Sequence, residues 1–303
     1  MYKNKFGILK RYFMKKIVTF FILLLFAPAL YSQNIGISGT VRWDTMRLNA
    51  EITLDLISAG LRLPAGRTQG ESILNADYLN LIRPGLLGLR IDSSSTIADL
   101  IERGEFSLLE IEALALGANK TAPFLSNDMR SMSSSYLIPL ENISSALISH
   151  SRPSPVARIL NPVSSPRYTG IIIIALGDLP VYGMRGTSRA VPCLFPKIWD
   201  SEMNLIYDKS MLESRYTAMA RYSSSENIFK TDHPSGLSAE LREVVGDRPL
   251  RIFAQGVFGI NPTDLIIDRI DALQIISTDE NRSLLSQGKV AIILNESALS
   301  YDF

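Results

Sequence analysis

Apolar and polar residues alternate along two neighbouring stretches in the first part of the chain. Residues 35–41 and 48–56 show this alternation, and the short segment 43–45 lies between them. A period of two is typical of a β-strand, because successive side chains point to opposite faces of the sheet. The pattern therefore predicts a β-hairpin.

A mixture of helical and strand patterns follows this hairpin. The expected elements, in chain order, are a helix at 65–82, a strand at 86–91, helices at 96–103 and 107–116, a strand at 136–140 and a helix at 143–150. Pro84 should stop the first helix, because proline removes a helical hydrogen bond and clashes with the preceding turn. Residues 92–95 supply N-caps for the helix at 96–103, and Gly117 should end the next one. Strands and helices without strict alternation indicate an α+β layer.

A proline-rich segment separates this region from the second half of the chain. Residues 151–167 contain four prolines, which disfavour helices and sheet ladders and keep the chain extended. A polyproline recognition motif is the alternative, but no clean P-x-x-P pattern with a basic anchor is present. We interpret the segment as a linker between an N-terminal domain, residues 33–150, and a C-terminal domain, residues 168–303.

Four consecutive isoleucines, residues 171–174, mark a strand of the second half that should be buried on both faces. The expected elements are strands at 168–175, 191–199 and 204–207, a helix at 237–245, strands at 249–257 and 263–267, helices at 269–276 and 278–285, and a last strand at 289–294. Asp268, and either Ser277 or Thr278, can cap the two later helices. The fold class expected for the whole chain is α+β, as two small layered domains with mixed or antiparallel sheets.

The first residues have the parts of a secretory signal peptide. A basic start at residues 14–16 precedes an apolar stretch at 17–26 and small residues up to Ser32. The apolar stretch is shorter than the ~20 residues of a membrane-spanning helix, although an uncleaved anchor is the alternative. We therefore expect residues 1–32 to be a signal peptide and the mature chain to be exported to the periplasm or cell envelope, with no transmembrane segment.

The net charge and the cysteine content exclude some classes of partner and of stabilising bond. The formal net charge is +1, which argues against a nucleic-acid partner, because phosphate neutralisation needs a basic surface. Cys193 is the single cysteine, so an exported chain has no internal disulfide and depends on packing. The apolar neighbours of Cys193 predict an inert core thiol. The mean hydropathy of +0.13 indicates a well-filled core or an apolar contact surface.

Candidate catalytic residues are few. The two histidines, His150 and His233, lie near a helix end and in a turn, and no G-x-S-x-G motif is present. Two isolated histidines and one cysteine give none of the spacings of a zinc site. The loop from Gly177 and Asp178 to Gly186 matches no phosphate-binding fingerprint, and a glycine-rich hairpin connection explains it better. We expect no catalytic, cofactor or metal site.

Paired acids are the remaining candidates for general acid and base chemistry. Asp264 with Asp268, and Asp271 with Asp279 and Glu280, lie at the ends of expected elements. Helix capping explains these positions without an acid–base pair of the kind that glycosidases use.

A series of segments in the second half resembles a known group of proteins. The matching segments are 168–174, 194–200, 204–207, 249–252, 259–264, 271–272 and 285–290. Together they are similar to the C-terminal part of bacterial envelope proteins related to the flagellar FlgP-type outer-membrane lipoproteins. In length and layout the chain looks most like exported proteins of spirochaetes. The resemblance implies an envelope location, and for several members assembly into rings around the flagellar motor. It implies no catalytic residues.

Two departures from that group limit what the resemblance implies. Residues 174–177 replace the acidic residue and arginine that FlgP-type proteins usually carry after the first strand, and the lipid-bearing cysteine is missing. These differences weaken the expectation of a binding role for that loop and of direct outer-membrane anchoring.

Three functions are compatible with the sequence. The first is a non-enzymatic envelope protein that assembles with itself or with other envelope proteins, such as the flagellar motor. The second is a binding module for peptidoglycan or another envelope polymer, although Trp43, Tyr78 and Trp199 are scattered along the chain. The third is a hydrolase whose carboxylates come together only in the fold.

Overall fold

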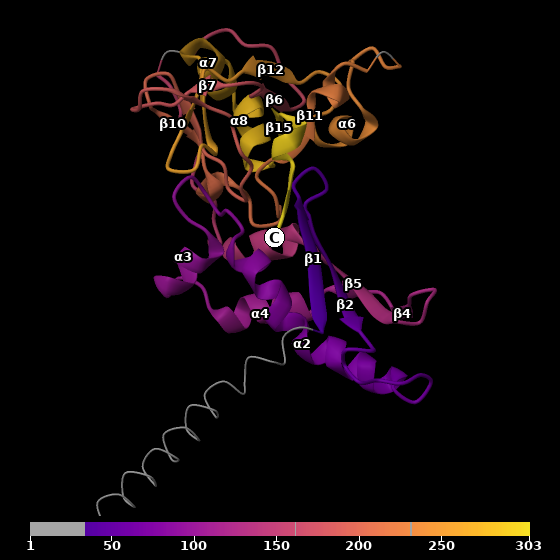
Figure 1. The fold of residues 1–303 in the computed structure, drawn as a ribbon. Helices are drawn as coiled ribbons and strands as arrows, with labels where there is room; N and C mark the ends of the chain where they lie inside the picture. The colour runs from indigo at the N-terminus through magenta and orange to yellow at the C-terminus, as the bar shows by residue number, and fades with distance from the viewer. Residues whose placement is uncertain (1–33, 161, 231) are drawn as a thin grey trace, which may run out of the picture. The chain divides into compact units, whose positions relative to one another are not determined.

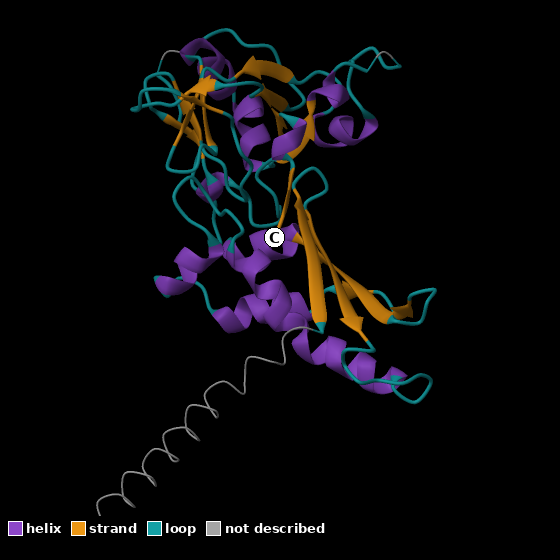
Figure 2. Ribbon diagram, viewed as in Figure 1, coloured by secondary structure: helices purple, strands orange, loops and turns teal. Residues whose placement is uncertain are grey.

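A computed structural model describes residues 34–160, 162–230 and 232–303, so the expected signal peptide lies outside the described residues. The described chain forms two compact units. The smaller comprises residues 34–36, 52–76 and 123–134, and the larger comprises residues 37–51, 77–122 and 135–303. Helices and strands are interleaved, and the sheets are antiparallel, parallel and mixed (Figure 2). The α+β fold class is therefore confirmed.

The antiparallel sheet confirms the predicted hairpin. Its strand order is β16-β1-β2-β5-β3, and β4 pairs separately with β5. The strands are β1 (Ile35–Arg42), β2 (Arg47–Asp55), β3 (Asn119–Lys120), β4 (Phe124–Leu125), β5 (Ser131–Pro139) and β16 (Ser300–Asp302). β1 and β2 follow the alternating pattern, since the apolar positions of β2 are buried and those of β1 are buried or half-buried, while the positions between them are more exposed. β16 lacks such a pattern and was not predicted, yet it pairs with β1 from Thr40 to Arg42.

Four helices accompany these strands: α2 (Arg67–Leu87), α3 (Ile97–Glu102), α4 (Leu108–Leu116) and α5 (Leu140–Leu147). Thr96 and Ser107 form capping boxes at the start of α3 and α4, so α3 is capped by Thr96 and not by residues 92–95 as expected. The predicted stop at Pro84 is wrong, because α2 continues to Leu87. Gly88 donates to the carbonyl of Pro84 at 3.0 Å, and Leu86 is buried in the core, so packing and the later hydrogen bonds outweigh the one that proline removes. The strand expected at 86–91 is reduced to an isolated bridge at Arg90.

A parallel sheet forms the centre of the second half (Figure 1). Its order is β11-β15-β6-β12, with β6 (Ile171–Ile174), β11 (Arg221–Ser224), β12 (Leu250–Phe253) and β15 (Val290–Leu294). All four isoleucines of β6 are buried, which confirms that it is a central strand covered on both faces. The helix α6 (Ala239–Val245) packs on the face that carries Ile172, Ile174 and Ile293. This sheet fixes β11 as a strand at one edge.

A second, mixed sheet has the order β10-β9-β14-β13. Its strands are β9 (Ile198–Asp200), β10 (Leu205–Tyr207), β13 (Gly256–Phe258) and β14 (Asp264–Ile267). The strand expected at 191–199 is shortened to β9. The preceding residues pack irregularly, with Cys193, Leu194 and Phe195 buried, because Pro192 and Pro196 cannot donate to a ladder.

The remaining elements agree with the local signals in the sequence. α7 (Arg269–Ile276) is capped by Asp268, and α8 (Asp279–Ser286) is capped by Thr278. The glycine-rich loop is a small hairpin, as expected, of β7 (Leu179–Pro180) and β8 (Thr187–Ser188). Gly183 and Gly186 take positive φ between them, a conformation that glycine adopts without a steric cost.

The proline-rich segment 151–167 has no helix or strand in its described residues. Hydrogen bonds nevertheless hold it against α7 and α8. Ser165 donates to the carbonyl of Gln274 at 2.9 Å, and the buried Asn281 amide donates to Ser165 Oγ and to the carbonyl of Pro166. The segment is therefore attached at its C-terminal end.

Candidate functional site

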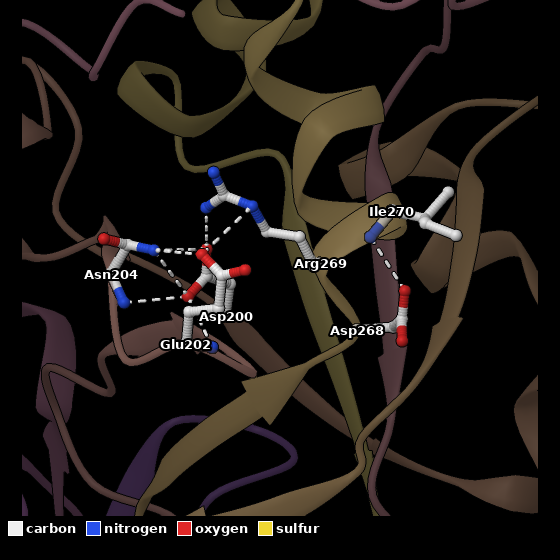
Figure 3. Close-up of polar contacts among 6 residues, drawn as sticks. All are labelled: Asp200, Glu202, Asn204, Asp268, Arg269 and Ile270. Atoms are coloured by element: carbon white, nitrogen blue, oxygen red, sulfur yellow. Dashed lines mark hydrogen bonds and ion pairs between the residues drawn. The ribbon is translucent and has the colours of Figure 1, made fainter.

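A cluster of charged and polar side chains surrounds Asp200, at the end of β9 (Figure 3). The backbone N–H groups of Glu202 and Asn204 donate to Asp200 Oδ1 at 3.0 and 2.8 Å, and the Asn204 amide donates to both carboxylate oxygens. The guanidinium of Arg269, the first residue of α7, also donates to Oδ2. The cluster closes the β9–β10 turn and ties it to α7.

The electrostatics of Asp200 indicate a structural role. Burial alone raises the pKa of this carboxyl, but the hydrogen bonds from Asn204, Glu202 and Arg269 outweigh it and lower the pKa. The side chain is fully buried, and its two oxygens already accept several hydrogen bonds. An ionised carboxylate saturated in this way holds its neighbours in place and has little capacity left for a substrate.

Asp264 is a second buried carboxylate, and its environment differs. It accepts hydrogen bonds from the hydroxyl of Ser93 at 3.0 Å, the indole N–H of Trp199 at 3.1 Å and the backbone N–H of Lys197 at 3.3 Å. Burial is the largest influence and raises the pKa of this carboxyl above its ordinary value. The expectation that Asp264 caps a helix is wrong: it begins β14 and links three segments through the hydrogen bonds from Ser93, Lys197 and Trp199.

The other candidate residues are also engaged in the fold. Burial raises the pKa of Cys193 to about 12, so the thiol is protonated at neutral pH, as expected for an inert core residue. His150 Nε2 lies 2.7 Å from the carbonyl of Leu212, and His233 Nδ1 lies 2.7 Å from Ser235 Oγ within its turn. Asp178 forms an exposed ion pair with Arg189.

An open groove of about 430 Å³ runs beside β11. Arg221, Tyr222 and Ser223 of β11 line it, together with residues of α6. Asp44 and Thr45, in the turn between β1 and β2, also line it. All of these residues belong to the larger compact unit. The fold thus leaves a groove beside an edge strand.

A polar hollow of about 350 Å³ adjoins this groove, because Asp44 and Asn227 line both. Ser224 and Glu296, at the carboxyl ends of β11 and β15, also line it. Ligands of parallel sheets commonly bind outside the carboxyl ends of the strands. The groove and the hollow together are therefore the best candidate for a functional site, which we call the β11 groove.

Sequence reasoning missed this site. The segment Arg221–Ser224 is polar and short, and it lies next to further serines, so it gives no strand signal. Tyr222 was the only available hint, since tyrosine favours strands. The strand forms because Tyr222 is buried, contacts the Trp43 ring edge-on at 5.9 Å, and bonds through its hydroxyl to the backbone of Cys193.

None of the helices in residues 34–303, apart from the undescribed positions 161 and 231, is both long and apolar enough to cross a membrane. Among the same residues, no group of three or more histidine, cysteine, aspartate or glutamate side chains is arranged to hold a metal ion.

Comparison with protein families gives two matches. Residues 34–146 match the family described as the N-terminal domain of Treponema pallidum Tp0624, and residues 170–296 match the family described as the second domain of the same protein. None of the curated proteins matches the chain. The chain is therefore similar to a spirochaete protein in two successive domains, while the resemblance to FlgP-type proteins stays a prediction.

Proposed function

We propose that this two-domain, spirochaete-type chain is a non-enzymatic assembly protein of the cell envelope that binds a protein partner, or another copy of itself, in the β11 groove. One observation carries this proposal: the groove lies beside an edge of β11 that pairs with no strand among the described residues. Strand edges are common sites of association with other chains.

The state of the other reactive groups supports this proposal over a hydrolase. Asp200 is saturated by donors, Asp264 is enclosed by Ser93 and Trp199, and the Cys193 thiol stays protonated. A carboxylate pair acting as acid and base must reach a substrate from both sides of the bond that is cleaved. The two buried aspartates are instead used to hold turns and segments together.

Polymer binding is less well supported than protein binding. A site for a carbohydrate polymer would need exposed aromatic rings along a groove. Trp43 is fully buried, and Tyr78 is buried against Tyr136, with the ring centroids 3.9 Å apart. The groove presents backbone and carboxylates instead, which suit a polypeptide.

The proposal also includes a location in the cell envelope and a connection with the flagellar motor. The leader pattern of residues 14–32 and the FlgP-like segments support them. Fractionation of cells that produce a tagged copy tests the location, with N-terminal sequencing of the recovered protein. A mature N-terminus near Gln33 in the periplasmic or membrane fraction is expected, and an intact leader in the cytoplasm would contradict it.

Site-specific photo-crosslinking in cells tests the binding function. A photoreactive residue replaces the exposed Thr45 in the groove wall, and a matched variant carries it at Leu109, an exposed position of α4. We expect a defined protein adduct, identified by mass spectrometry, at Thr45 and not at Leu109. That partner, once purified, should bind the wild-type chain in solution. Equal labelling at both positions, or adducts only with glycan strands, would reject the proposal.

A further inference from the structure

β11 lies at one edge of the parallel sheet, where Arg221 and Ser224 are half-buried and Tyr222 and Ser223 are buried. β11 pairs with β15 in parallel from Arg221 to Ser224, and in the part of the chain that the structure describes no strand pairs with its other edge. Successive residues of a strand direct their backbone groups to opposite edges, so half of the N–H and C=O groups of β11 point away from β15. Parallel sheets usually cover such edges, because unpaired backbone groups favour pairing with another chain.

The register of the sheet decides which side chains an added strand would meet. Arg221 and Ser223 pair with Ala291 and Ile293, which lie on the face that α6 covers. A strand added beside β11 would therefore place alternate side chains beneath α6. There it would face Glu240, Glu243 and the half-buried Val244. Its other side chains would point away from α6.

The arginines that line the groove and the hollow have ion-pair partners, whereas two of the glutamates have none among the described residues. Arg42 pairs with Asp44 at 2.5 Å, and Arg221 pairs with Glu141, so both arginines that line the groove and hollow are already neutralised. Glu240 and Glu243 form no ion pair in the described part of the chain. Hydrogen bonds from the backbone N–H of Glu240 itself and from Ser238 lower the pKa of Glu240, which is therefore ionised at neutral pH. Glu296 adds a further carboxylate in the adjoining hollow.

We propose that the occupant of the β11 groove is an extended basic segment of a protein, which adds to the edge of β11 as a further strand and places alternate lysine or arginine side chains against Glu240 and Glu243. Backbone hydrogen bonds to β11 supply affinity, and the acidic wall selects the charge. The half-buried Val244 contacts the aliphatic parts of the basic side chains. The inference rests on the proposed function for the identity of the groove as the binding site.

A short peptide of alternating lysine and valine, blocked at both ends and carrying a fluorophore, is the probe. Fluorescence anisotropy with the full chain measures its affinity at low and at physiological salt. We expect binding that weakens with salt, and little binding of the matched peptide of alternating glutamate and valine. The double variant Glu240→Gln, Glu243→Gln should bind the lysine peptide about tenfold more weakly, since two surface ion pairs of up to ~1 kcal/mol each are lost.

Two controls separate strand addition from simple charge attraction. Glu51→Gln, Glu102→Gln makes the same charge change at exposed positions outside the groove and should retain wild-type affinity. A lysine–valine peptide N-methylated at every second residue keeps its charge but cannot pair along one edge, so it should bind about tenfold more weakly. Equal affinity of the methylated peptide, or an unchanged affinity of the Glu240/Glu243 variant, would overturn the proposal. Thermal unfolding of each variant confirms that it is folded.

The binding function and the basic-strand proposal can be rejected separately. A Thr45 adduct with a partner whose contacting segment is acidic or helical would reject the basic strand and leave the binding function standing. Binding of the lysine peptide as expected, without any protein adduct at Thr45 in cells, would reject the binding function and retain the chemical preference of the groove.

Discussion

The cluster around Asp200 and the β11 groove both contain charged side chains, but they use them in opposite ways. In the cluster, each oxygen of the Asp200 carboxylate accepts hydrogen bonds from neighbours fixed by the β9–β10 turn and by α7. In the groove, Glu240 and Glu243 have no ion-pair partner among the described residues, and the adjacent edge of β11 is unpaired.

This difference separates stability from function in the same compact unit. A buried charge is tolerated only when hydrogen bonds and opposite charges compensate for its desolvation, so a saturated cluster indicates a role in the fold. Exposed carboxylates beside an unpaired edge contribute little to stability and remain available to a partner. We therefore expect the cluster to govern unfolding and the groove to govern binding.

The largest expected change in the free energy of unfolding comes from a substitution in the parallel sheet that contains β11. Ile173→Asp places a carboxylate at a fully buried position of β6 and should lower the free energy of unfolding by several kcal/mol, enough to unfold a domain of ordinary stability. Ile173→Val at the same position should cost only about 1 kcal/mol. Chemical denaturation measures both. A well-folded Ile173→Asp variant would show that one face of the sheet is open.

Removal of the Asp200 carboxylate should have the next largest effect. Asp200→Ala leaves the N–H groups of Glu202 and Asn204 without their acceptor and removes one of the two ion-pair partners of the partly exposed Arg269, which keeps Glu202. We expect a loss of about 2–4 kcal/mol in the free energy of unfolding. Affinity for the lysine peptide, measured where the variant is folded, should not change. A selective loss of binding would move the functional site to the cluster.

The contributions of Asp200 and Asp264 to stability should depend on pH in opposite directions. The pKa of Asp200 is lowered, so the stability it contributes is present above the unfolded pKa of about 3.9 and is lost as the pH falls through the folded pKa. The pKa of Asp264 is raised, so its contribution is present below about pH 3.9 and is lost as the pH rises through the folded pKa.

Unfolding of Asp200→Asn and Asp264→Asn from pH 3 to pH 7 tests this contrast. The stability advantage of the wild type over Asp200→Asn should shrink toward acid pH, and the advantage over Asp264→Asn should shrink toward neutral pH. Parallel profiles for the two variants would show that the environments of the two carboxylates do not differ as described.

The smallest effect on stability is expected in the groove. Glu240→Gln, Glu243→Gln should change the free energy of unfolding by less than about 0.5 kcal/mol, because both side chains are exposed and neither forms an ion pair among the described residues. A loss comparable to that of Asp200→Ala would show that the acidic wall stabilises α6 instead of serving a ligand.

Much of the fold follows from strong local signals in the sequence. The buried run at Ile171–Ile174, the alternating hairpin strands, and the capping residue Asp268 each act through neighbouring residues in the chain. Such signals do not depend on which distant segments pack nearby, so they were predictable.

The elements that escaped prediction depend on distant partners. β11 is held by Tyr222, whose hydroxyl bonds to Cys193, and its own serines carry no periodic pattern. β16 pairs with β1 from the other end of the chain, and the ring of Phe303 fits only because Gly39 and Gly85 lack side chains. Because the groove is built from β11 and from turns far away in the sequence, the candidate site could not be derived from local pattern.

Amide hydrogen exchange of the full chain, with and without a saturating amount of the lysine–valine peptide, tests the central claim most directly. The account predicts new protection in Arg221–Ser224, in the amides that point away from β15, and little change around Asp200 or in the proline-rich segment. Protection confined to another region, with unchanged exchange in β11, would contradict the assignment of the β11 groove as the binding site.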